Sequence, residues 1–137
     1  MSKIKTFIDA NVLIAAFRGQ PHISEKAFMI IDDPKREFIA NDYLKLEVIP
    51  QPKYNDRQEE TEFMEAFFEN VSQLIRSDPG ITLKALELGS QYGLGAMDAL
   101  HASAAIQAQA DEFITLEKNS KPLFRLNNLN VKSLLDI

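Results

Sequence analysis

Short apolar runs alternate along the chain with segments whose apolar residues recur at helical spacing. The apolar runs predict five strands, over residues 3–8, 37–40, 71–76, 112–115 and 130–134. The amphipathic segments predict helices over residues 11–18, 24–32, 57–70, 82–92 and 96–110, with a shorter helix beginning at Asn41 or Asp42. Strands that alternate with helices are typical of a parallel sheet, so the pattern predicts a doubly wound α/β fold.

Glycine and proline indicate where the helices are expected to stop. Residues 19–21, Gly-Gln-Pro, separate the first two helices, and residues 77–80, Ser-Asp-Pro-Gly, are expected to form a turn. Pro50 and Pro52 are expected to end or kink the helix that begins near Asn41, and Gly93 to end helix 82–92.

Four acidic residues either follow a predicted strand or lie on a predicted helix. Asp9 and Glu117 follow predicted strands, Asp98 opens an alanine-rich helix, and Glu47 lies in the short helix after Asn41. Because sites in open α/β sheets form beyond the carboxyl ends of the strands, we expect Asp9 and Glu117 to lie together. Two unit charges about 4 Å apart repel by about 4 kcal/mol at an effective dielectric of about 20. Gathered carboxylates therefore need protons or a divalent cation such as Mg²⁺, which prefers oxygen ligands.

Composition narrows the chemistry further. The chain has 137 residues, which fits one domain over residues 1–137, and it has no cysteine and two histidines. Disulfides, thiolate zinc sites, cysteine nucleophiles and histidine-rich metal sites are therefore excluded. The net charge of −5 argues against tight nonspecific binding of duplex DNA but leaves a nucleic-acid enzyme open.

The N-terminus is charged and lacks a long apolar segment, so no signal peptide is expected. No apolar stretch approaches the roughly 18 residues that a membrane span requires. We therefore expect a soluble, cytoplasmic protein without a membrane partner.

Four short motifs, taken in order, resemble the PIN domain family, which includes VapC-like toxin ribonucleases. Residues 9–11, Asp-Ala-Asn, follow the first strand, and Glu47 lies on the helix after the second strand. Residues 98–102 read Asp-Ala-Leu-His-Ala on a helix, and Thr115 with Glu117 closes a later strand. The resemblance extends over nearly the whole chain, and the order of the four motifs is more specific than any one of them.

The resemblance implies a three-layer α/β/α sandwich around a parallel sheet of about five strands. It also implies a Mg²⁺- or Mn²⁺-dependent ribonuclease site that hydrolyses single-stranded RNA, an antitoxin partner and a homodimer. The residues that match the acidic catalytic and metal-binding positions are Asp9, Glu47, Asp98 and Glu117, and the supporting polar positions are Asn11, Thr115 and Asn119. Glu117 and Asn119 stand where the family usually has aspartate, and the longer glutamate side chain displaces its carboxylate.

Other interpretations of the same residues stay open. Asp9 could simply cap the following helix, and Asp98 could be stabilised by the helix macrodipole alone. His101 is more typical of a hydrogen-bonded structural histidine than of a base. The chain could also be a catalytically weak PIN fold that binds RNA or protein without turnover. A phosphatase or receiver-like domain is disfavoured, because residues 9–11 lack the second aspartate of that motif.

Two surface features have both an ordinary and a functional interpretation. Helix 57–70 has a wide apolar face, which indicates core packing first and a dimer or antitoxin groove second. Several basic residues fall near the predicted site in sequence and could position phosphates. These residues are Lys45, Lys53, Lys118, Lys121 and Arg125.

Overall fold

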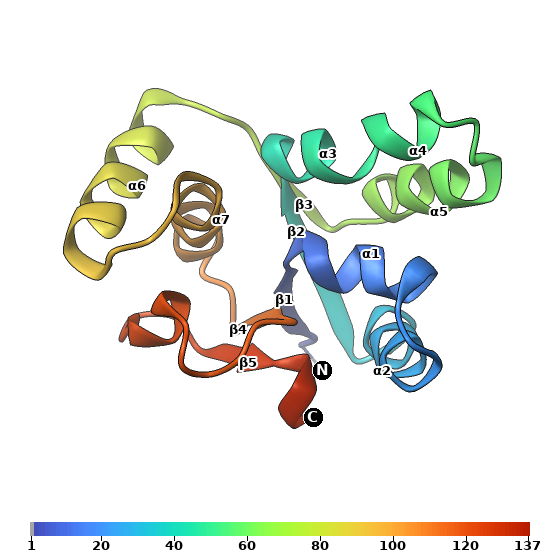
Figure 1. Cartoon of the computed structure of the whole chain (residues 1–137). Helices are drawn as coiled ribbons and strands as arrows, with labels where there is room; N and C mark the ends of the chain where they lie inside the picture. The colour runs from blue at the N-terminus through green and yellow to red at the C-terminus, as the bar shows by residue number, and fades with distance from the viewer. Residues whose placement is uncertain (1) are drawn as a thin grey trace.

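Within residues 2–137, which the computed structural model describes, five parallel strands form one sheet (Figure 1). The spatial order is β3-β2-β1-β4-β5, so β1 is the central strand. The strands are β1 (Ile4–Ile8), β2 (Arg36–Asn41), β3 (Gln73–Ile75), β4 (Glu112–Thr115) and β5 (Val131–Ser133). The predicted three-layer α/β/α sandwich around a parallel sheet is confirmed.

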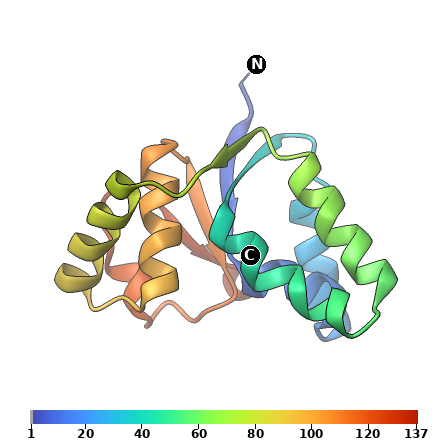
Figure 2. The same ribbon diagram turned by 90° about the horizontal axis from the view of Figure 1, so that it is seen from above.

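Helices cover the two faces of the sheet unequally, as Figures 1 and 2 show. One side carries α1 (Ala10–Arg18), α2 (Pro21–Ile31), α3 (Asp42–Val48), α4 (Pro50–Tyr54) and α5 (Gln58–Glu69). The other side carries α6 (Pro79–Tyr92) and α7 (Ala96–Gln107). Two short 3₁₀ turns, η1 (Pro122–Arg125) and η2 (Leu134–Asp136), complete the elements near the C-terminus.

The core lies on both faces of the three central strands. Phe7, Ile8, Phe113 and Ile114 are fully buried, and the Phe7 and Phe113 rings stack with centroids 5.1 Å apart. Burial on both faces explains why the apolar residues Phe7–Ile8 and Phe113–Ile114 are consecutive instead of alternating with polar residues. On α5, Met64, Phe67 and Phe68 are buried in the same core, so the apolar face of this helix serves packing.

Proline accounts for most differences between the predicted and observed helix boundaries. Pro21 and Pro79 each occupy the first position of a helix instead of the expected break. The helix α3 ends at Val48, just before Pro50, as predicted, but Pro50 also begins a helix, α4, that the sequence pattern did not predict. The first turn of a helix does not use its N–H groups, so proline is favourable there. Asp78 completes the start of α6, because its Oδ1 accepts a hydrogen bond from Ile81 N at 2.9 Å.

The order in which the chain adds its strands reverses direction at β1, which creates a topological switch point beside this strand. After β1 the chain adds β2 and β3 on one side, then crosses through α6 and α7 and places β4 on the other side of β1. The carboxyl ends of β1 and β4 therefore meet where connections leave in opposite directions, which is where ligand sites form in open α/β sheets. None of the helices within residues 2–137 combines the length and apolarity that crossing a membrane requires.

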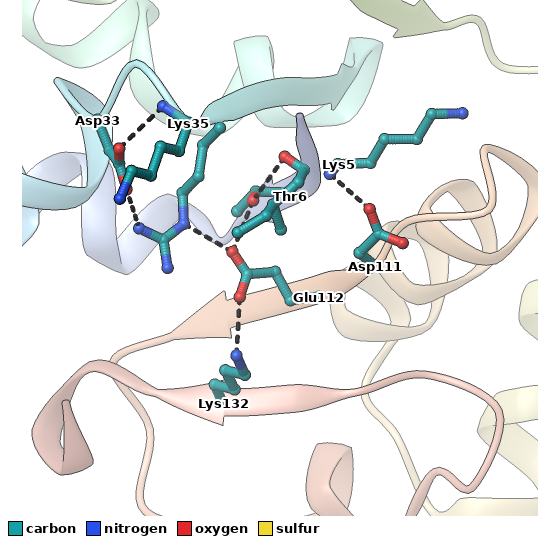
Figure 3. A network of polar contacts seen from close by, with 9 residues as sticks. Lys5, Thr6, Asp33, Lys35, Asp111, Glu112 and Lys132 are labelled. Carbon is teal, nitrogen blue, oxygen red and sulfur yellow. Dashed lines mark hydrogen bonds and ion pairs between the residues drawn. The ribbon is translucent and has the colours of Figure 1, made fainter. Parts of the chain in front are cut away.

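A buried ion network lies toward the opposite, amino edge of the sheet (Figure 3). The side chain of Glu112 is only 2% exposed at the start of β4. Its carboxylate accepts hydrogen bonds from Thr6 Oγ1 at 2.7 Å, Arg36 Nε at 2.7 Å and Lys132 Nζ at 3.0 Å. These hydrogen bonds connect four neighbouring strands, because the four residues belong to β1, β2, β4 and β5.

Candidate active site at the carboxyl edge of the sheet

The hydroxyl group of Thr115 connects the ends of the two strands at the switch point. Thr115 Oγ1 donates to Asp9 Oδ2 at 2.9 Å and accepts from Asn11 Nδ2 and from the Glu117 backbone N, both at 3.3 Å. Asn11 Oδ1 in turn accepts from Leu116 N at 3.1 Å. The structure therefore brings Asp9, Asn11, Thr115 and Glu117 together, as the strand-end argument predicts.

Asp9 serves two purposes at this edge. It is the N-cap of α1, with Oδ1 accepting from Ala10 N at 2.9 Å, so the interpretation as a helix cap holds. Its second carboxylate oxygen faces Thr115, and the residue is only 5% exposed. The cap fixes the side chain in place without preventing it from taking part in a polar site.

Asp98 and Glu47 approach the same edge from helices. Asp98 is the third residue of α7, in the first turn, where the macrodipole favours a carboxylate. Glu47 lies on α3, and its side chain is 31% exposed. The charge of Asp98 acts on both Asp9 and Glu117, and the charge of Glu47 acts on Asp98, so the four carboxylates share one electrostatic environment.

Burial and mutual repulsion raise the pKa values of Asp9, Asp98 and Glu117. Burial raises the pKa of Asp9, and the charge of Asp98 adds to the increase, although Thr115 and Ala10 oppose it by hydrogen bonding. Burial also raises the pKa of Asp98, and Glu47 adds to it. The pKa of Glu117 is raised by burial and then by Asp98 and Asp9, with Lys121 opposing. A positive charge on His101 would lower the pKa of Asp9 and of Asp98.

These oxygen donors fit a hard divalent cation in chemical type, and a cation would relieve their repulsion. Their spacing is looser than a closed coordination shell: across residues 2–137, no three His, Asp or Glu side chains are grouped closely enough to hold a metal ion together.

Two buried residues beside Glu47, Asn41 and His101, were not assigned to the site from the sequence pattern. His101 is 1% exposed, and its two ring nitrogens lie against Asn41 Nδ2, at 3.0 Å, and against Glu47 Oε1. Asn41 is predicted as a helix cap, and it is one: its Oδ1 accepts from Leu44 N at 2.8 Å. His101 is hydrogen-bonded and buried, in line with the structural interpretation, but one of its partners is a candidate site carboxylate.

The remaining predicted residues are exposed or have partners outside the cluster. Asn119 is exposed in the loop after β4. Lys121 is near enough to act on Glu117, whereas Lys53 pairs with Glu65 at 3.8 Å and Lys45 lies over the Phe68 ring. Arg125 donates to the Tyr92 carbonyl oxygen, and Lys118 is exposed. Lys121 is therefore the best placed of these cations for a phosphate near Glu117.

Removing the Thr115 hydroxyl should loosen the site. In Thr115→Val the Asp9, Asn11 and Glu117 groups lose their common partner, so we expect a loss of about 1–3 kcal/mol in unfolding free energy. Urea denaturation of the metal-free protein measures this loss. Thr115→Ser keeps the hydroxyl and is the matched control, and a valine variant as stable as the serine variant would contradict the role given to this group.

Comparison with known proteins places the chain in a family. The PIN domain family model matches residues 6–122. A toxin–antitoxin complex from Klebsiella pneumoniae has a similar fold, with a TM-score of 0.71 and 18% identity over 94% of this chain and 97% of that one. VapBC-1 from nontypeable Haemophilus influenzae aligns with a TM-score of 0.70 and 16% identity over 96% and 99%.

A third similar structure is VapBC2 from Rickettsia felis bound to a DNA fragment from its promoter. It aligns with a TM-score of 0.68 and 17% identity over 95% of this chain and 98% of that one. No curated protein matches the sequence. The family match spans most of the chain, including the segments that carry Asp9, Glu47, Asp98 and Thr115, and the chain therefore belongs to the PIN domain family.

Proposed function

We propose that this protein is a divalent-metal-dependent endoribonuclease that hydrolyses phosphodiester bonds of single-stranded RNA. The observation that supports this most is the hydrogen bond between Thr115 and Asp9, which joins the carboxyl ends of β1 and β4 beside Asp98 and Glu117. Family membership supports the nuclease class, and the oxygen-only donor set supports Mg²⁺ or Mn²⁺.

In this proposal Asp9, Glu47, Asp98 and Glu117 hold the cation, directly or through water. When bound, the ion supplies a water of lowered pKa and offsets charge on the phosphate oxygens. Thr115 and Asn11 fix the direction of the Asp9 carboxylate through their hydrogen bonds. Lys121, whose charge reaches Glu117, attracts the phosphate of the RNA backbone to the same edge.

The biological setting is part of the same proposal. The three similar structures are toxin–antitoxin assemblies, and they support a toxin role with an antitoxin partner for this chain. We propose in addition that the protein forms a homodimer, as the family resemblance implies, and that it is cytoplasmic.

A test of the activity uses single-stranded RNA with Mn²⁺ or Mg²⁺ and with EDTA in a parallel reaction. Cleavage that appears with either metal and disappears with EDTA is the expected result. Cleavage that EDTA leaves unchanged would exclude the metal mechanism. Absence of cleavage together with RNA binding would favour the second candidate, a PIN fold that binds without turnover, which is supported by the loose spacing of the acidic side chains.

The raised carboxyl pKa values predict how metal binding depends on pH. A protonated carboxyl cannot ligate a cation, and burial raises the pKa of Asp98 and of Asp9 above the ordinary value of 3.8. Mn²⁺ affinity should therefore begin to fall on acidification at a higher pH than unperturbed aspartates require. Calorimetric Mn²⁺ titrations across the acidic range measure this, and an affinity that stays constant down to the ordinary aspartate pKa would contradict the prediction.

A further inference from the structure

Three residues form a polar row that runs from the end of β2 to the candidate site. Asn41 is the last residue of β2 and the N-cap of α3, His101 lies on α7, and Glu47 lies on α3. The His101 ring connects the other two, with Nδ1 toward Asn41 and Nε2 toward Glu47. Asn41 and His101 are 2% and 1% exposed, so water does not replace these partners.

The backbone sets the direction of every hydrogen bond in this row. Leu44 N can only donate, so the Asn41 atom that faces it at 2.8 Å must be the oxygen. The Asn41 atom that faces His101 is then the amide nitrogen, which can only donate, so His101 Nδ1 must accept. The ring proton consequently resides on Nε2, which donates to the Glu47 carboxylate.

We infer that Asn41 and His101 are positioning residues that hold Glu47 in the candidate metal site, with His101 as the neutral Nε2–H tautomer. The assignment of Glu47 to a metal rests on the proposed function, whereas the tautomer rests on the hydrogen bonds alone. The bond from His101 engages Glu47 Oε1 and leaves Oε2 for a cation or a water. Glu47 is 31% exposed and would otherwise lose this orientation to free rotation in solvent.

The surroundings of the ring fix its plane as well as its tautomer. The Phe7 ring packs against His101 with centroids 5.4 Å apart, and Phe7 itself is fully buried in β1. A rigid imidazole therefore presents its N–H to Glu47 from the core side. Partners of this kind, which orient a ligand without touching the metal, typically change metal affinity by about 10–100-fold when they are lost.

The tautomer is tested by nitrogen NMR of histidine-labelled protein. The chain has two histidines, and His22→Gln assigns the signals by elimination, since His22 is exposed. We expect His101 to show the shifts of a protonated Nε2 and an unprotonated Nδ1 near neutral pH. A protonated Nδ1, alone or together with a protonated Nε2, would overturn the inference, and this experiment needs neither metal nor RNA.

The positioning role is tested by Mn²⁺ affinity in two matched variants. His101→Phe keeps an aromatic ring against Phe7 but has no donor, and we expect it to bind Mn²⁺ about 10–100-fold more weakly than wild type. His101→Gln keeps both an acceptor for Asn41 and a donor for Glu47, and we expect it to restore most of the affinity. Thermal unfolding without metal checks that both variants fold.

A third variant acts from the other end of the row. Asn41→Ser can still cap α3 but is too short to reach His101, so we expect weaker Mn²⁺ binding and loss of the single tautomer in the NMR spectrum. If wild type and all three variants bind Mn²⁺ equally, the positioning role is wrong and the metal site stands. If wild type binds no Mn²⁺, the proposed function fails and the positioning role fails with it, whatever the tautomer.

Discussion

Replacing Asp98 by asparagine should lower metal-dependent RNA cleavage by at least about 100-fold. Loss of a residue that only orients a metal ligand typically reduces affinity or activity by about 10–100-fold, and Asp98 is proposed as a ligand itself. Asparagine keeps the shape of the side chain and removes the charge that acts on Asp9 and Glu117. Initial rates on a fluorogenic single-stranded RNA with Mn²⁺ measure the effect.

The matched control for this experiment is Asp56→Asn. Asp56 is exposed and has a φ of 54°, a left-handed conformation that asparagine adopts readily, so the variant removes one charge without disturbing the fold. It should cleave RNA like wild type. Equal cleavage by Asp98→Asn and Asp56→Asn would remove Asp98 from the catalytic group.

The same Asp98 variant should not lose stability in the absence of metal. Burial raises the pKa of Asp98, so its ionised form is favoured less in the folded than in the unfolded chain, and ionisation near neutral pH opposes folding. Removing the charge relieves that opposition. A clear loss of thermal stability in the metal-free variant would mean that reduced cleavage reports misfolding instead of chemistry.

The largest effect on stability is expected at the other edge of the sheet, in Glu112→Gln. This change removes the buried anion shared by Arg36 and Lys132 and leaves Arg36 paired with Asp33 alone, and we expect a loss of about 3 kcal/mol in unfolding free energy at neutral pH, within the range for breaking a buried ion pair (Figure 3). Lys132→Gln is the matched control, and because Lys132 is 45% exposed it should lose only about 0–1 kcal/mol.

The Glu112 contribution should also disappear in acid. Hydrogen bonds from Arg36, Thr6 and Lys132, with the charge of Arg36, outweigh burial and hold the pKa of Glu112 below its ordinary value of 4.5. A carboxyl with a lowered pKa stabilises the fold above its unfolded pKa, and this stabilisation is lost as the pH falls through the folded pKa. Urea denaturation should therefore show the wild type and Glu112→Gln converging as the pH drops below about 4.5. A constant difference would contradict the assignment.

The strand ends could be predicted from sequence because they depend on local patterns. Residues 112–115 are found as predicted, and Asp9 and Thr115 meet because parallel strands share one carboxyl edge. The prolines are harder to interpret, because a proline can follow the end of one helix and also occupy the first turn of the next, and only the surrounding chain decides which. Pro50 shows this, since it opens α4 directly after α3.

Partners that lie far apart in sequence account for what the pattern missed. Asn41 is recognisable as a helix cap from its neighbours alone, but its bond to His101 spans 60 residues and depends on how α7 packs against β2. The engagement of Glu47 by His101 has the same origin. A polar cap at a strand end, together with a histidine one turn after an aspartate, is the signal that could have indicated this row.

The proposed activity depends most on one divalent cation bound by carboxylates that follow β1 and β4 and that lie on α3 and α7. A crystal structure of the protein soaked in Mn²⁺, with anomalous diffraction to locate the ion, tests this directly. We expect an ion at the carboxyl edge of β1 and β4 with oxygens of Asp9 and Asp98 among its ligands. An ion bound elsewhere, or no ion at this edge at millimolar Mn²⁺, would contradict it.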